Sequence, residues 1–247
     1  MRRGMEFVLM LALTGGAGPL FAQASHSDAG AVVLDKVVGI VNGDVILESD
    51  VQEEIHFAHL EPIGVPTGSD TLQRAMRRLV SRTLILQQMK EQQQSYPVSN
   101  ADIKAQLDEV RKSLPACKEH DCTTEDGWKN FLAANDLTEA DVLAHWRQRI
   151  QILKFIDVRF RTGIRISSKE ISDYYNKAIV TSFAKSGTPP PPLDKISQRI
   201  QEVLLQQHVN ETLRDWLKTL RDEGSVQILD PAYGQSTGSG ADTEEDD

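Results

Sequence analysis

The chain has 247 residues and a formal net charge of −9. An acidic chain repels the phosphate backbone, so this charge argues against non-specific nucleic-acid binding. Beyond the N-terminal segment, no apolar run approaches the length of about 20 residues that a membrane-spanning helix requires. We therefore expect no integral membrane segment in the mature chain.

The N-terminus has the pattern of a secretory signal peptide. A basic pair precedes a short apolar run, and an Ala-Gln-Ala triplet supplies the small residues typical of a cleavage site. The pattern predicts a signal peptide over residues 1–24, with cleavage between Ala24 and Ser25. A flexible segment is expected over residues 25–33, and the protein is expected to be exported.

A β-hairpin is predicted directly after this segment. Two β-branched runs, residues 37–41 and 45–47, flank the pair Asn42-Gly43. Both central positions of the preferred two-residue hairpin turn need a positive φ, which asparagine and glycine tolerate. A two-stranded hairpin is marginal in water, so this one requires a further strand or a helix.

Helical periodicity dominates the rest of the chain. Apolar residues recur every three or four positions, and Ser49 and Ser167 each have the capping-box spacing of a helix start. The predicted helices cover residues 49–60, 69–94, 99–114, a short segment around Trp128, a long segment from Thr138 to Gly163, and residues 167–184 and 193–222. A linker over 185–192 contains four consecutive prolines, which favour a stiff extended backbone.

One more strand is expected near the C-terminus, at residues 225–229, where the side chains alternate before Pro231. Because strand candidates are scarce, we expect this strand to pair with the N-terminal hairpin. The predicted fold is mainly α, a multi-helix domain over residues 34–230 that is closed by a small antiparallel sheet. Residues 231–247, rich in small and acidic residues, are predicted to be a disordered tail.

The two cysteines, Cys117 and Cys122, lie close together in the segment CKEHDC. In an exported chain, this spacing favours a disulfide that fixes a local turn. A metal site formed by Cys117, His120 and Cys122 is an alternative, but three ligands without a further pair make a poor structural zinc site. Two free thiols are the third interpretation.

No catalytic or cofactor motif is recognisable in the sequence. Glycine-rich nucleotide loops, the G-x-S-x-G turn and H-E-x-x-H are absent. His56 and His59 have the i, i+3 spacing of half a metal site, but a matching second pair is missing. The pair Glu53-Glu54 fits a solvated helix face, and the basic residues between 147 and 161 fit either a solvated face or a patch for an anionic partner. We expect neither enzymatic activity nor a metal or cofactor.

Two parts of the chain resemble a known family. The segment DKVVGIVNGDVILESDV at 35–51, together with the helix containing LVSRTLILQQMKE, is similar to the N-terminal domain of SurA-type periplasmic chaperones. The run VLLQQHVNETLRDWLKTLR from Val203, closed by SVQIL, resembles the C-terminal helix and strand of the same family. In that family both ends join one chaperone domain, so the resemblance implies the strand pairing proposed above.

The chain departs from this family between its two halves. Members typically carry one or two parvulin-type prolyl isomerase domains there, whereas here only the linker 185–192 separates an N-terminal part, 34–184, from a C-terminal part, 193–230. The resemblance therefore implies a periplasmic, ATP-independent holdase without isomerase activity. Its partners would be unfolded exported proteins, including outer-membrane precursors. A prolyl isomerase with a cryptic site and a structural or assembly partner are the alternative functions.

Overall fold

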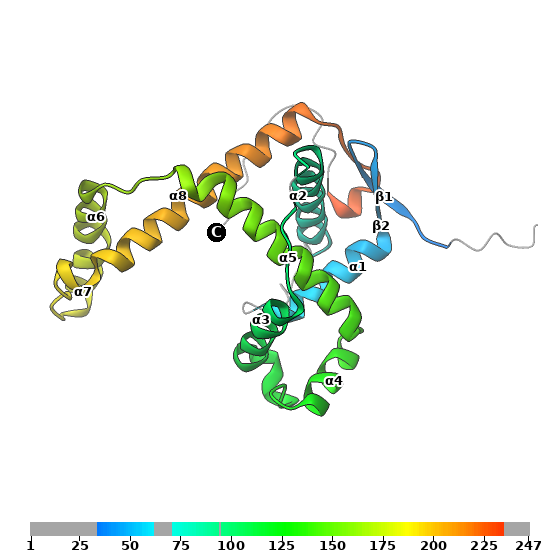
Figure 1. The fold of residues 1–247 in the computed structure, drawn as a ribbon, viewed down its shortest axis with the longest axis horizontal. Helices are drawn as coiled ribbons and strands as arrows, with labels where there is room; N and C mark the ends of the chain where they lie inside the picture. The colour runs from blue at the N-terminus through cyan, green and yellow to red at the C-terminus, as the bar shows by residue number, and fades with distance from the viewer. Residues whose placement is uncertain (1–33, 62–70, 94, 235–247) are drawn as a thin grey trace, which may run out of the picture. The chain divides into compact units, whose positions relative to one another are not determined.

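The computed structural model describes residues 34–61, 71–93 and 95–234 (Figure 1). The predicted signal peptide, its cleavage site at Ala24 and Ser25, and the acidic residues after 234 lie outside this part. The described residues form a mainly α-helical fold with a small antiparallel sheet, which confirms the predicted fold class. The described residues from Asp35 to Gly234 belong to one unit.

The sheet has the strand order β2-β1-β3. Strands β1 (Val37–Val41) and β2 (Asp44–Leu47) form the predicted hairpin, and Asn42 and Gly43 take φ values of 51° and 94° in its turn. Strand β3 (Val226–Ile228) lies antiparallel to β1 on the other side. The predicted pairing of the two ends of the domain is therefore confirmed.

Asn42 fixes this closure from within the turn. Its backbone N–H donates to the carbonyl oxygen of Ser225 at 2.8 Å, and its side-chain Oδ1 accepts from the Ser225 N–H at 2.7 Å. The turn thus holds the start of β3 as well as reversing the chain between β1 and β2.

The helices largely follow the predicted spans. The α-helices are α1 (Glu48–Phe57), α2 (Thr71–Glu91), α3 (Asn100–Ser113), α4 (Glu125–Ala134), α5 (Glu139–Phe160), α6 (Ser168–Tyr174), α7 (Thr181–Ser186) and α8 (Leu193–Glu223). The short helical turns are η1 (Ala58–Leu60), η2 (Pro115–Glu119), η3 (Arg161–Gly163) and η5 (Pro231–Tyr233), and the π-helical segment η4 (Tyr175–Val180) joins α6 to α7.

The start of α1 differs from the prediction. Leu47, and not Ser49, is the N-cap residue, and the Asp50 carboxylate accepts a hydrogen bond from the Leu47 N–H at 2.8 Å. The Ser49 hydroxyl donates to the Asp35 carboxylate, which the prediction did not consider. The capping pattern predicted from sequence fails here because Asp35, which lies outside the helix, accepts the hydrogen bond of the Ser49 hydroxyl.

Three apolar clusters hold the helices together. The first, which we call the sheet core, packs Val38, Val41 and Val226 of the sheet against α1 and α2. A second lies among α3, α4 and the N-terminal half of α5, and the third surrounds Phe155 of α5. Trp216 of α8 reaches the third cluster, with its ring centroid 5.9 Å from that of Phe155.

The domain extends beyond the predicted boundary at residue 230. Pro231–Tyr233 form η5, and Tyr233 is buried in the sheet core. The Tyr233 hydroxyl donates to Glu48 Oε1 at 2.6 Å, and this bond, with partial desolvation, raises the pKa of Tyr233 to about 12. These residues therefore belong to the folded domain and not to the predicted tail.

Residues 168–199, which we call the arm, differ from the rest of the domain. The arm comprises α6, η4, α7, the proline-rich linker and the first turns of α8, and Figure 1 shows α6 and α7 beside the N-terminal part of α8. No residue of the arm is buried. Within the arm, the Tyr175 hydroxyl donates to the Pro191 carbonyl at 2.8 Å. Glu170 of α6 also lies 3.5 Å from His208, which belongs to the part of α8 beyond the arm.

Candidate functional site

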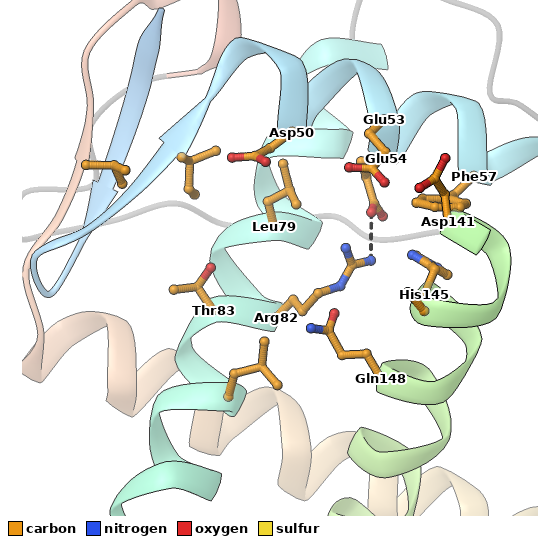
Figure 2. A pocket seen from close by; sticks show the side chains of 14 residues that line it. Asp50, Glu53, Glu54, Phe57, Leu79, Arg82, Thr83, Asp141, His145 and Gln148 are labelled. Carbon is orange, nitrogen blue, oxygen red and sulfur yellow. Dashed lines mark ion pairs between the residues drawn. The ribbon is translucent and has the colours of Figure 1, made fainter. Parts of the chain in front are cut away.

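A polar pocket of about 360 Å³ lies among α1, α2, α5 and strand β2 (Figure 2). Each helix contributes four residues with the spacing i, i+3, i+4, i+7, which places them on one face over two turns. The lining residues of the helices are Asp50, Glu53, Glu54 and Phe57 of α1, Leu79, Arg82, Thr83 and Leu86 of α2, and Asp141, Ala144, His145 and Gln148 of α5. Val45 and Ile46 of β2 complete the wall.

A buried ion pair forms one wall of the pocket. The side chain of Glu54 is only 4% exposed, and Arg82 Nη2 lies 2.6 Å from its Oε2. Arg78 lies 3.9 Å from the other carboxylate oxygen and makes a closer pair of 2.9 Å with Glu61. Desolvation by burial raises the pKa of Glu54, while the two arginines oppose that shift. The sequence interpretation of Glu53-Glu54 as a solvated face is therefore wrong for Glu54.

His145 is held in the pocket wall as a neutral ring. It stacks on Phe57 with ring centroids 3.8 Å apart. Burial, together with the positive charges of Arg82 and Arg149, lowers the pKa of His145 to about 3. The imidazole therefore carries no positive charge near neutral pH and does not balance the carboxylates around it.

Glu53 and Asp141 face the pocket from α1 and α5. The pKa of Glu53 is raised, first by desolvation and then by the negative charges of Asp141 and Asp50. Figure 2 shows Glu53, Glu54 and Asp141 gathered where α1 approaches α5. The pocket therefore combines apolar side chains with carboxylates that repel one another.

Replacing Glu54 with glutamine is expected to change the pH dependence of stability. Because the folded-state pKa of Glu54 is raised, the native state binds its proton more tightly than the unfolded state, and wild-type stability falls as the pH rises from 4.5 through the raised pKa. Each pKa unit corresponds to about 1.4 kcal/mol. Glu54→Gln lacks this loss, so its stability relative to wild type improves as the pH rises above 4.5.

Urea denaturation at a series of pH values upward from 4.5 measures the difference in stability between the two proteins. Glu54→Gln also loses the ion pair with Arg82, which lowers its free energy of unfolding at every pH. The change of the stability difference with pH, and not its absolute size, therefore tests the prediction. Gln52→Ala on the exposed side of α1 is the control, since it removes no titrating group. A Glu54→Gln difference that is flat with pH contradicts the prediction.

Of the two cysteines and the described histidines, only His145 lines this pocket. Cys117 and Cys122 lie in the turn between α3 and α4, and their sulfur atoms are 2.10 Å apart, at disulfide distance. His120 packs edge-on against Phe131. His56 and His59 are both half-buried on α1 and η1. Within the described ranges, no group of three or more acidic, histidine or cysteine side chains is arranged to hold a metal ion.

The basic residues between 147 and 161 do not form one patch. They make separate contacts: Arg147 with Asn100, Arg149 over Trp146, Lys154 with the Pro97 carbonyl, Arg159 over Trp216 and Arg161 with Glu202. Each positive charge is thus directed to a different neighbour. The contacts favour a structural role over a common site for an anionic partner.

The sequence did not indicate the pocket, because its residues come from four elements that are distant in the chain. The spacing Asp50, Glu53, Glu54, Phe57 was visible as one helix face, but only the packing of α2 and α5 against α1 encloses it. Along the described residues, no helix is both long enough and apolar enough to cross a membrane. A scan of protein-family models and a search of curated proteins find no match to this chain.

Proposed function

We propose that this chain is an exported, ATP-independent holdase that binds unfolded segments of exported proteins, as SurA-type periplasmic chaperones do. The main support for the proposal is the arm, whose apolar side chains are not buried. A holdase needs apolar side chains that stay accessible in the folded state, and such surface is uncommon on a protein with no partner.

The arm supplies apolar surface of this kind. Half-buried apolar side chains follow one another along it, namely Ile171, Tyr174, Tyr175, Ile179, Val180, Phe183, Leu193 and Ile196. None has enough neighbours to be buried, so each retains apolar area for contact with another chain. Leu153 and Val158 on α5 and Val203 on α8 are further exposed apolar side chains outside the arm.

The closure of the domain also supports the proposal. The resemblance implies that the N-terminal hairpin and the C-terminal strand share one chaperone domain, and β1 pairs with β3 in this fold. This agreement concerns the scaffold, whereas the resemblance itself supplies the client class and the periplasmic location. The proposal assigns the chain no catalytic role.

Suppression of aggregation tests the proposed function. We expect the mature protein, without ATP, to keep a chemically unfolded outer-membrane protein from aggregating on dilution, as measured by light scattering. The double variant Ile179→Ser with Phe183→Ser removes two apolar groups from one face of the arm, and we expect roughly tenfold more of it to be needed. The exposed pair Asn176→Ser with Lys177→Ser is the matched control and should behave as wild type.

Three outcomes would contradict the proposed function. A wild-type protein that suppresses no aggregation and binds no unfolded chain is not a holdase. A pull-down that yields one stoichiometric partner would favour an assembly role, and acceleration of a proline-limited refolding reaction would favour an isomerase. That reaction is slow enough to follow, on the order of tens of seconds without a catalyst.

A further inference from the structure

Strand β2 is an edge of the sheet with an open backbone position. In a two-residue hairpin the pair next to the turn, Val41 and Asp44, is hydrogen-bonded, so the next pair, Ile40 and Val45, is not. The N–H and C=O of Val45 therefore point away from β1. Among the described residues neither group has a hydrogen-bond partner, and the Val45 residue is 55% exposed. An added strand could accept and donate one bond there.

The pocket reaches this edge. Val45 and Ile46 both line it, although neighbouring residues of a strand point to opposite faces of a sheet. A cavity that contacts both residues meets the strand along its edge and does not lie on one face alone. A chain that pairs with β2 would therefore run beside the opening of the pocket.

The walls of the pocket suit a long cationic side chain. Leu79 and Leu86 of α2 offer apolar contact for a methylene stem, and the carboxylates line the pocket from α1 and α5. The volume of about 360 Å³ lies within the range of about 300–1,000 Å³ that is usual for ligand pockets.

The charge balance of the pocket is negative. Four carboxylates line it against one guanidinium, that of Arg82, which is already paired with Glu54. Asp50 accepts a hydrogen bond from the Leu47 N–H and Asp141 accepts one from the Thr138 hydroxyl, while the negative charges of both act on Glu53. Of the nearby cations, Arg78 lies between Glu61 and Glu54, and Arg149 lies over the Trp146 ring, so among the described residues neither makes an ion pair with Glu53 or Asp141.

We propose that an extended polypeptide adds as a strand to the free edge of β2 and places a lysine or arginine side chain in the pocket, beside Glu53 and Asp141. The new strand would exchange two backbone hydrogen bonds with Val45, a mode of binding that recognises any extended chain. The cation would relieve the repulsion between the two carboxylates and supply selectivity. This inference rests on the proposed function and names the class of segment that one site of the holdase prefers.

Peptide binding to the full mature chain tests the charge selectivity. The probe is a fluorescently labelled peptide of alternating valine and threonine with one central lysine, compared with peptides that carry glutamate or leucine at the centre. By fluorescence anisotropy we expect the lysine peptide to bind about tenfold more tightly than the glutamate peptide, as for one partly desolvated ion pair. Equal affinities, or a preference for glutamate, would overturn the proposal.

Variants locate this selectivity in the pocket. The double variant Glu53→Gln with Asp141→Asn alters two exposed residues, and the asparagine amide oxygen can still accept from the Thr138 hydroxyl, so the fold should tolerate it. The preference for lysine should fall to about twofold or less. Glu211→Gln on the exposed side of α8 is the matched control and should keep the full preference. A preference that survives the double variant places the selectivity elsewhere and contradicts the proposal.

A backbone test locates the strand pairing. Two lysine peptides are compared, one N-methylated on the odd residues and the other on the even residues, so that each lacks the N–H donors along one edge of the strand. We expect one of the two to bind about tenfold more weakly than the unmodified peptide. Val45→Pro removes the matching donor from β2 at a position outside the β1–β2 hydrogen bonds, and should weaken the unmodified peptide. Equal binding of both methylated peptides would contradict strand addition, whatever the folding of Val45→Pro.

The outcomes separate this inference from the proposed function. If the wild type suppresses aggregation but shows no lysine preference, the holdase stands and the pocket proposal fails. If the wild type suppresses no aggregation, the function fails whatever the peptide data show. A change from dimer to monomer in Val45→Pro, without peptide binding to the wild type, would assign the edge to a second copy of this chain and overturn the inference.

Discussion

A chain that ends at Gly224 is expected to lose the cooperative unfolding transition of the sheet core, whereas a chain that ends at Gly234 keeps it. The shorter chain lacks β3 and η5, and with them the buried side chains of Val226 and Tyr233 and the half-buried Ile228. Each fully buried apolar side chain contributes about 1.5–3 kcal/mol, so the total loss is about 5 kcal/mol. That is comparable to the entire stability of many domains, about 5–15 kcal/mol.

Thermal unfolding followed by far-UV circular dichroism measures this effect. The chain ending at Gly234 is the control, because it retains Tyr233 and its hydrogen bond to Glu48. The loss extends beyond the deleted side chains, since removal of β3 also uncovers one side of β1, where Val38 and Val41 are completely buried. A chain ending at Gly224 that melts within a few degrees of the control would show that the sheet closure contributes little.

Arg111→Met is expected to destabilise the α3–α4 region by about 3 kcal/mol. The Arg111 side chain is only 8% exposed, and its Nε and Nη2 donate to the carbonyls of Cys122 and Thr124 at 2.6 and 3.0 Å. Nη1 donates to Glu125 at 3.0 Å. Methionine would fill a similar volume but remove both donors. The Thr124 carbonyl keeps its bond from the Trp128 N–H, whereas the carbonyl of the buried Cys122 loses its Arg111 donor. The cost of an unsatisfied buried acceptor exceeds the net gain from a formed bond.

The neighbouring residue supplies the control for this variant. Lys112 is 61% exposed and its amine contacts Glu109 at the surface, so Lys112→Met should cost about 0.5 kcal/mol or less. Arg111→Lys should recover little, because one ammonium cannot reproduce the planar fork of a guanidinium that bonds two carbonyls. Urea denaturation of the three variants measures the costs, and similar losses for Arg111→Met and Lys112→Met would contradict the prediction.

The bond from Arg111 to Cys122 also gives the cysteine turn a structural role. The turn holds the sulfur atoms of Cys117 and Cys122 at disulfide distance, while the Thr124 hydroxyl at its end caps α4 by accepting from the Gly127 N–H at 3.1 Å. Arginine on α3 therefore connects this turn to the second apolar cluster. The sequence indicated the cysteine pair, but not the arginine that connects its turn to α4.

Local patterns were sufficient for the hairpin and most helix ends. Asn42-Gly43 reversed the chain as predicted, and Ser167 capped α6 with Glu170 in the predicted reciprocal arrangement. These features depend on residues three or four positions apart, so the backbone conformation follows from neighbours in the chain. Where a distant residue competes, the same reasoning fails, as it did for Ser49 when Asp35 accepted its hydroxyl.

The sequence by itself determined the helical class, the hairpin and the scarcity of strands, and that scarcity predicted the closure of β1 by β3. Only the tertiary structure decided that Glu54 is buried, that His145 stacks on Phe57 and that Val45 borders a pocket. The physical reason is that periodicity specifies which side chains share a face, whereas burial, pairing and charge depend on which other element packs against that face.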